Sequence, residues 1–160
     1  MLKPLTSTYK HALGKAHDVN WPIISARYKL SEGFIHRHRD VVSWEHIWTY
    51  QRLSERFITD HLAYADWWVI SEHQRLSERF IDKHRDNVIW SSISEHQRLS
   101  EQFILKHQSR VNWWHISRRQ DLSKEFIIAY IDRLNLNVII RRYPKLCKKY
   151  HMEMARVLRG

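Results

Sequence analysis

Histidine, serine and glutamate are the residues of this sequence that could carry chemistry. The chain has 12 His, and a Ser, a Glu and a His brought together could form a hydrolase site, whereas neutral imidazoles could bind a metal ion. Each of these residue types, however, recurs four or five times at a fixed interval. An active site needs one constellation, so residues that return at every interval are interpreted as architecture. We therefore expect no catalytic residue, no metal ligand and no cofactor.

The interval is 23 residues, and it carries two blocks of apolar side chains. The first block is a tryptophan column (Trp21, Trp44, Trp67, Trp90, Trp113) followed by an isoleucine column (Ile24, Ile47, Ile70, Ile93, Ile116). The second is a Leu-Ser pair (Leu30, Leu53, Leu76, Leu99, Leu122 and the serines after them) followed by Phe-Ile (Phe34, Phe57, Phe80, Phe103, Phe126 and the isoleucines after them). A valine column (Val19, Val42, Val88, Val111) precedes the first block. Such a period is typical of stacked helical repeats.

Each block has helical spacing, with Trp and Ile three residues apart and Leu and Phe four apart. Leu99 follows Ile93 by six residues, about 240° around an ideal helix, so one straight helix would place the two blocks on different faces. The pattern favours two short helices per repeat, although one long helix stays open because no Gly or Pro interrupts the segment. The serines after the leucine column stand where an N-cap would open the second helix. Asn20, Ser43, Asp66 and Asn112 stand in the same place before the first helix, where Ile89 is the exception.

The sequence therefore predicts an all-α fold, a solenoid-like array of short helix-turn-helix repeats. We expect a degenerate N-terminal cap over 1–18, tandem repeats over 19–143 and a basic C-terminal capping helix over 144–160. Stacking would bury the Trp, Ile, Leu, Phe and Val columns in one continuous core. A base-stacking platform is the alternative for the tryptophan column, but its helical register with the isoleucines favours the core.

Three further features could lie outside this core. Trp48, Trp68 and Trp114 stand outside the tryptophan column, which makes them candidates for an exposed partner-binding surface. The histidine column (His38, His61, His84, His107) favours half-buried imidazoles that hydrogen-bond across repeat junctions over a metal ladder, because Tyr130 continues it. The recurrent Glu-His-Gln at 72–74 and 95–97 is expected on the surface.

The net charge of +10 lies at the two ends of the chain. Residues 133–160 hold eight Lys or Arg against one Glu, whereas residues 30–132 hold 14 against 15 acidic residues. The candidate contacts to an anionic partner are Arg141, Arg142, Lys145, Lys148, Lys149, Arg156 and Arg159. This segment could be a solvated cap, an anchor to an acidic protein or a nucleic-acid contact, since charge alone does not name the partner. The single Cys147 and the lack of a long apolar run favour a soluble, intracellular protein without a membrane span.

The motif Q-R-L-S-E-R-F-I-D-K-H-R-D-N-V-I-W-S-S-I-S over residues 74–94 resembles a short tandem repeat of uncharacterised proteins of large DNA viruses. The resemblance covers roughly residues 19–140. It implies a viral origin, with action in the infected-cell cytoplasm or inside the virion, and it transfers neither an active site nor a ligand.

The leading hypothesis is a non-enzymatic repeat protein that binds another protein, as a structural or assembly component of a virus particle with capsid or assembly proteins as partners. Its motivation is a neutral array with variable outer positions, such as the column of His36, Thr59, Asp82 and Leu105. The alternative is nucleic-acid binding through the basic termini, chiefly residues 141–160. No phosphate-cradling glycine loop, singular triad or metal motif favours an enzyme.

Overall fold

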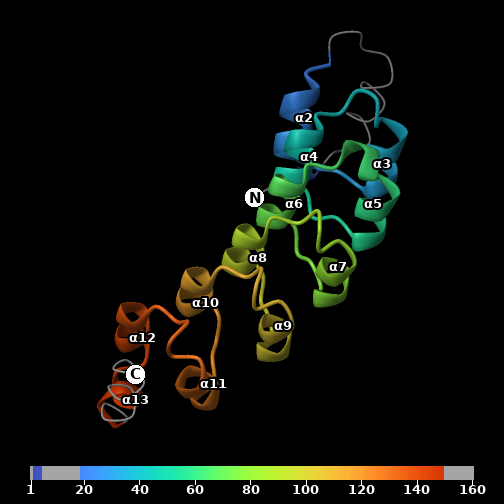
Figure 1. Ribbon diagram of the computed structural model, residues 1–160. Helices are drawn as coiled ribbons and strands as arrows, with labels where there is room; N and C mark the ends of the chain where they lie inside the picture. Colours follow the sequence, from blue (N-terminus) through green and yellow to red (C-terminus); the bar gives the residue numbers. More distant parts are fainter. Residues whose placement is uncertain (1, 5–18, 150–160) are drawn as a thin grey trace. The chain divides into compact units, whose positions relative to one another are not determined.

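The computed structural model describes residues 2–4 and 19–149, and this part of the chain is an all-α array of short helix pairs, as the sequence predicts (Figure 1). Contacts divide the chain into two compact units, Met1–Val88 and Ile89–Gly160. The first unit contains α2 (Trp21–Arg27), α3 (Glu32–Arg37), α4 (Trp44–Tyr50), α5 (Glu55–Asp60), a 3-10 turn η1 (Leu62–Tyr64), α6 (Trp67–His73) and α7 (Glu78–Lys83). The second contains α8 (Trp90–His96), α9 (Glu101–Lys106), α10 (Trp113–Arg119), α11 (Lys124–Ala129), α12 (Leu136–Arg142) and α13 (Pro144–Lys149).

A short parallel pair of strands was not predicted. Strand β1 (Lys3–Pro4) pairs with β2 (Tyr28–Lys29), the extended link between α2 and α3. Of the predicted C-terminal capping helix, only Pro144–Lys149 lies in the described part of the chain, where it is helical. The predicted N-terminal cap over 1–18 lies, apart from residues 2–4, outside the described residues.

The break between the two helices of a repeat is confirmed. In each described repeat the serine after the leucine column is extended, and its hydroxyl accepts a hydrogen bond from the backbone N–H of the Phe three residues on, as in Ser54 and Phe57 (3.1 Å). The first helices are capped by Asn20, Asp66 and Asn112, whereas Ile89 provides no cap, as its apolar side chain leads one to expect. The cap predicted for Ser43 is wrong, because its hydroxyl bonds His46 Nδ1 (2.7 Å) and not a backbone N–H of α4. These helices have only six or seven residues, too few to be stable alone, so inter-repeat packing must hold them.

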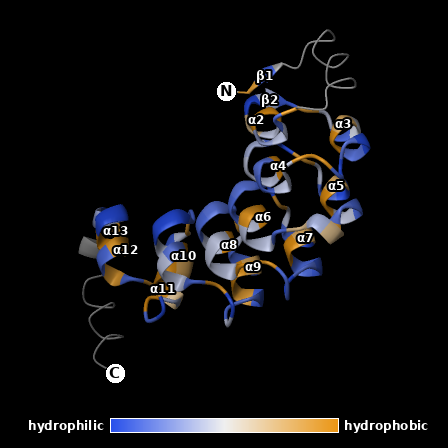
Figure 2. Cartoon of the chain, turned by 90° about the horizontal axis from the view of Figure 1, so that it is seen from above, coloured by the Kyte–Doolittle hydropathy of each residue, from blue (hydrophilic) through white to orange (hydrophobic). Residues whose placement is uncertain are grey.

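Within each unit the first helices of successive repeats pack side by side, α4 with α2 and α6, and α10 with α8 and α12 (Figure 1). The isoleucine columns are fully buried, for example Ile47 and Ile58 at 0% exposure, and the valine column is buried at Val42, Val88 and Val111. Figure 2 shows the result, helices with one hydrophobic and one hydrophilic side. The core predicted for these columns is confirmed.

The tryptophan column, in contrast, is only half-buried, so its assignment to the core was too strong. Each ring lies against the Phe and the His of its own repeat, as Trp90 does with Phe103 (6.2 Å between ring centroids) and His107 (4.7 Å), except that Tyr130 replaces the His beside Trp113. The indole N–H of Trp113 donates to the carbonyl of Gln108 at 3.0 Å. The column therefore forms the outer wall of an aromatic cluster inside each repeat.

Buried glutamines connect the repeats, contrary to the surface position expected for Gln74 and Gln97. Gln74 is 3% exposed, and its side-chain amide donates to the carbonyls of Trp48 and Gln51 while its oxygen accepts from the amide of Leu53. These backbone groups lie at and just after the C-terminal end of α4, the first helix of the previous repeat. The last carbonyls of a helix have no hydrogen-bond partner within that helix, so the glutamine satisfies them. Gln51 and Gln120 make the same three bonds one repeat earlier and two repeats later.

Candidate functional site

Two of the three predicted contact tryptophans are exposed and one is not. Trp68 is 56% exposed and Trp114 is 43% exposed, each at the position directly after a column tryptophan. Trp48 is 0% exposed, so the expectation that it belongs to a contact surface is wrong.

Trp48 is buried because it replaces a core serine. Ser25, Ser94 and Ser117 occupy its position in other repeats, fully buried. The hydroxyl of Ser94 accepts from the backbone N–H of Asn112 (2.9 Å) and holds the next repeat in place. Trp48 instead donates its indole N–H to the carbonyl of Tyr64 (2.8 Å) and stacks on Trp44.

The turn after α5 accommodates this larger side chain. It forms η1 in place of the wider turn seen at Val42 and Val111, whose amides bond back to the histidine four residues earlier. The small Ala65 takes the place of the valine column there. The substitution therefore fills the core and leaves no binding role for Trp48.

The basic C-terminal residues do not act as one set. Arg141 and Lys145 are exposed. Arg142 instead donates to the carbonyls of Ser117 (2.6 Å) and Gln120 (2.8 Å) and lies 3.6 Å from a carboxylate oxygen of Asp121.

Arg142 thus makes the two donor contacts that a column glutamine makes elsewhere, and the hydroxyl of Tyr143 accepts the remaining bond from Leu122. The assignment of Arg142 to an anionic-partner contact is therefore corrected to a structural role. The side chains of Lys148 and Lys149, together with Arg156 and Arg159, lie outside the described residues. Nucleic-acid contact through this segment stays a prediction.

In the histidine column His61, His84 and His107 are buried and His38 is half-buried. His61 bonds across a repeat junction. His61 Nδ1 lies 2.8 Å from the carbonyl of Phe57, so this nitrogen carries the proton, and Nε2 accepts from His36 Nδ1 at 3.1 Å. His84 is also buried, and its Nε2 has no hydrogen-bond partner. Burial, helped by the charge of Lys83, lowers the pKa of His84 below its ordinary value. In the part of the chain that the structure describes, no group of three or more His, Cys, Asp or Glu is arranged to hold a metal ion.

A surface that varies between repeats lies on the first helices. We define the first-helix outer face as the positions one, five and six residues after the tryptophan column, where Leu136 continues that column. It consists of Pro22, Ala26, Arg27, Glu45, Thr49, Tyr50, Trp68, Glu72, His73, Ser91, Glu95, His96, Trp114, Arg118, Arg119, Asn137, Arg141 and Arg142. None of these residues is buried. Apart from Arg142, which bonds the carbonyls of Ser117 and Gln120, side chains here are not constrained by core packing, in contrast to the repeated Ser, Phe and Ile of the second helices.

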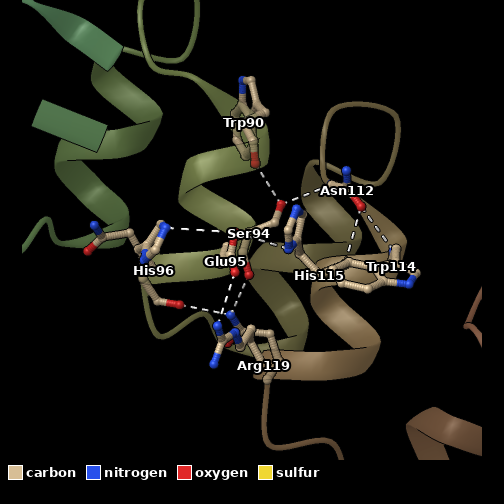
Figure 3. Close-up of polar contacts among 10 residues, drawn as sticks. Trp90, Ser94, Glu95, His96, Asn112, Trp114, His115 and Arg119 are labelled. Carbon is tan, nitrogen blue, oxygen red and sulfur yellow. Dashed lines mark hydrogen bonds and ion pairs between the residues drawn. The ribbon is translucent and has the colours of Figure 1, made fainter. Parts of the chain in front are cut away.

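In the second unit this face carries a polar cluster between α8 and α10 (Figure 3). The carboxylate of Glu95 accepts from Arg119 (3.1 Å) and lies 3.4 Å from His115 Nδ1. The Arg119 hydrogen bond, followed by the charges of His115 and His96, lowers the pKa of Glu95 although partial burial opposes this. Beside the cluster, the Arg118 guanidinium lies over the ring of Trp114 at 5.1 Å.

Glu95 and its neighbours have the residue types of a hydrolase but lack an activated nucleophile. Ser94, the adjacent serine, donates its hydroxyl proton to the carbonyl of Trp90 (2.7 Å) and accepts from Asn112 (Figure 3). The carboxylate is held ionised by Arg119, which makes it a poor general acid. The cluster is chemically suited to polar recognition beside an exposed aromatic ring.

No family model matches the chain, and no curated protein or solved structure is detectably similar to it. Among the described helices, none has both the length and the apolar character needed to cross a bilayer. The residues themselves are therefore the basis for a functional interpretation. The outer face had no simple signal in the sequence, because its positions are defined only by exclusion, after the buried repeated columns have been assigned.

Proposed function

We propose that the chain is a non-enzymatic repeat protein that binds another protein through the first-helix outer face. The observation that supports this is the contrast between constant buried columns and an outer face whose residues differ from repeat to repeat while exposing Trp68 and Trp114. Exposed aromatics next to arginines, such as Trp114 beside Arg118, are the residues that contribute most to protein interfaces.

The test compares Trp68→Ala and Trp114→Ala with a control, Leu62→Ala. Leu62 is 41% exposed but lies in η1, which is not part of the outer face. The full chain and each variant are used as bait in the cells in which the protein is naturally made. Quantitative mass spectrometry measures the proteins that co-purify with each bait. A partner recovered by the parent chain and by Leu62→Ala should be reduced about tenfold or more in the tryptophan variants, the loss typical of interface hot spots.

Two outcomes would refute the proposal. One is a parent chain that recovers no partner, and the other is a partner whose recovery does not change in either tryptophan variant. Thermal unfolding of all three variants serves as the folding control, because the replaced side chains are largely solvent-exposed.

The setting that we propose, a structural or assembly component of a virus particle, is supported by the repeat motif over residues 74–94. Mass spectrometry of purified particles, with crosslinking to identify neighbours of this chain, tests it. Absence of the chain from the particles would leave an interaction role in the infected cell.

A further inference from the structure

A hollow of about 650 Å³ opens on the first unit. It is lined by Leu2, Lys3, Ala26, Arg27, Thr49, Tyr50, Gln51, Arg52 and His73. Five of these residues, Ala26, Arg27, Thr49, Tyr50 and His73, belong to the first-helix outer face. The volume lies in the range of sites that hold a small ligand or a few side chains of a partner.

The charge of the lining is one-sided. Lys3, Arg27 and Arg52 are exposed, and among the described residues none of them forms an ion pair with a carboxylate. Other arginines of the same unit do have such neighbours, for example Arg56, which lies 3.8 Å from Asp60. Among the residues that the structure describes, no Asp or Glu lines the hollow. Three cations around one concave surface produce a positive potential that an anionic occupant would neutralise.

The lining also has an apolar part. Tyr50 is 51% exposed, and Leu2 and Ala26 also line the hollow. An occupant that presents carboxylates beside an apolar side chain would use both parts of the lining. Nucleic-acid surfaces that lack base readout distribute their cations along a groove that follows many phosphates, whereas here the three cations converge on one hollow.

We infer that this hollow binds an acidic peptide segment of a partner protein, with Arg27 and Arg52 contacting its carboxylates and Tyr50 its apolar side chain. The inference rests on the proposed function, because it names the chemistry of a partner for the same outer face. Guanidinium groups suit this role, since their planar donors bind carboxylates in pairs.

Fluorescence anisotropy of the full chain provides the test, with a fluorescein-labelled glutamate peptide that carries one central leucine. The variants are Arg27→Gln and Arg52→Gln, and the matched control is Arg79→Gln, which removes the same charge from an exposed position of α7 outside the hollow. Each hollow variant should weaken binding about tenfold or more, the usual effect of losing a charge-assisted hydrogen bond. Arg79→Gln should bind as the parent chain does, and a peptide with glutamine in place of glutamate should bind weakly to all of them.

Three results would overturn the inference: no peptide binding, an equal loss in Arg79→Gln, or tighter binding of a labelled oligothymidylate that depends on Arg27 and Arg52. The first two results would show that the hollow does not bind acidic peptides specifically. The third would show that it binds the phosphates of a nucleic acid. The proposed function is judged separately. If a partner still depends on Trp68 or Trp114 while the peptide test fails, only the acidic-peptide inference is wrong.

Discussion

Replacement of Gln120 by methionine tests the idea that buried glutamines connect the repeats. Gln120 is 3% exposed, and its amide nitrogen donates to the carbonyls of Ser94 (3.0 Å) and Gln97 (2.8 Å). Its oxygen accepts from the amide of Leu99 at 2.9 Å. Methionine has a similar volume and no strong hydrogen-bonding group, so the change removes three bonds while it creates little cavity.

The expected loss of unfolding free energy follows from the three backbone groups that lose their hydrogen-bond partner. A buried polar group without a hydrogen bond costs about 1–3 kcal/mol. Full additivity is not expected for groups that share one partner. We therefore expect the variant to lose about 3 kcal/mol or more of unfolding free energy, a large part of the total for a small domain.

The assay is urea unfolding followed by circular dichroism, together with amide hydrogen exchange of Leu99. Gln102→Met is the control, because Gln102 is exposed on α9 of the same unit. The exchange measurement is local, which matters because repeat arrays do not always unfold in one step. If Gln120→Met costs no more than Gln102→Met, or if the Leu99 amide keeps its protection, the reasoning about the glutamine column is wrong.

Two further predictions concern the aromatic side chains of the first unit. Trp48→Ala should cost about 3–5 kcal/mol of unfolding free energy, the range for deleting a buried aromatic, whereas Trp68→Ala should cost clearly less. Equal losses in urea titrations would contradict the assignment of Trp48 to the core and Trp68 to the surface. His84 has a lowered pKa in the folded state, so the unfolded chain binds more protons and stability falls as the pH drops through the unfolded value of about 6.5. His84→Phe removes the imidazole that lies against Phe80 and Trp67. The variant should show a smaller decline of unfolding free energy between about pH 7.5 and about 5.5. An unchanged slope would show that His84 does not contribute to the pH dependence of stability.

The features that were predictable from sequence depend on local physics. A serine hydroxyl can cap a helix wherever the residue stands before one, so the position of Ser54 predicted both the cap and the helix break. The isoleucine column was equally predictable, because apolar spacing along a helix defines its buried side. These signals need no knowledge of the neighbouring repeat.

The features that were missed depend on the neighbouring repeat. A glutamine at a helix end is usually solvated, and the role of Gln74 becomes evident only when the carbonyls of Trp48 and Gln51 are placed beside it. Its recurrence in four successive repeats, next to positions that vary, was the available signal. Trp48 had a signal too, since it occupies a serine column and Ala65 occupies the valine column in the same repeat. No signal in the sequence indicated that Arg142 and Tyr143 together make the contacts of a column glutamine.

The inward bonds of the repeat explain why its outer face can diverge. Serine caps, glutamine amides and first-turn glutamates, such as Glu55 bonded to the amide of Ser77, satisfy the backbone groups of neighbouring repeats. Apart from Arg142, which bonds the carbonyls of Ser117 and Gln120, these contacts do not use the residues of that face. The face can therefore carry a cation-lined hollow in one unit and a Glu95–Arg119 cluster in the other at no cost to the fold. If this is correct, exchanging outer-face residues between repeats should transfer binding without loss of stability, whereas exchanging column residues should do the reverse.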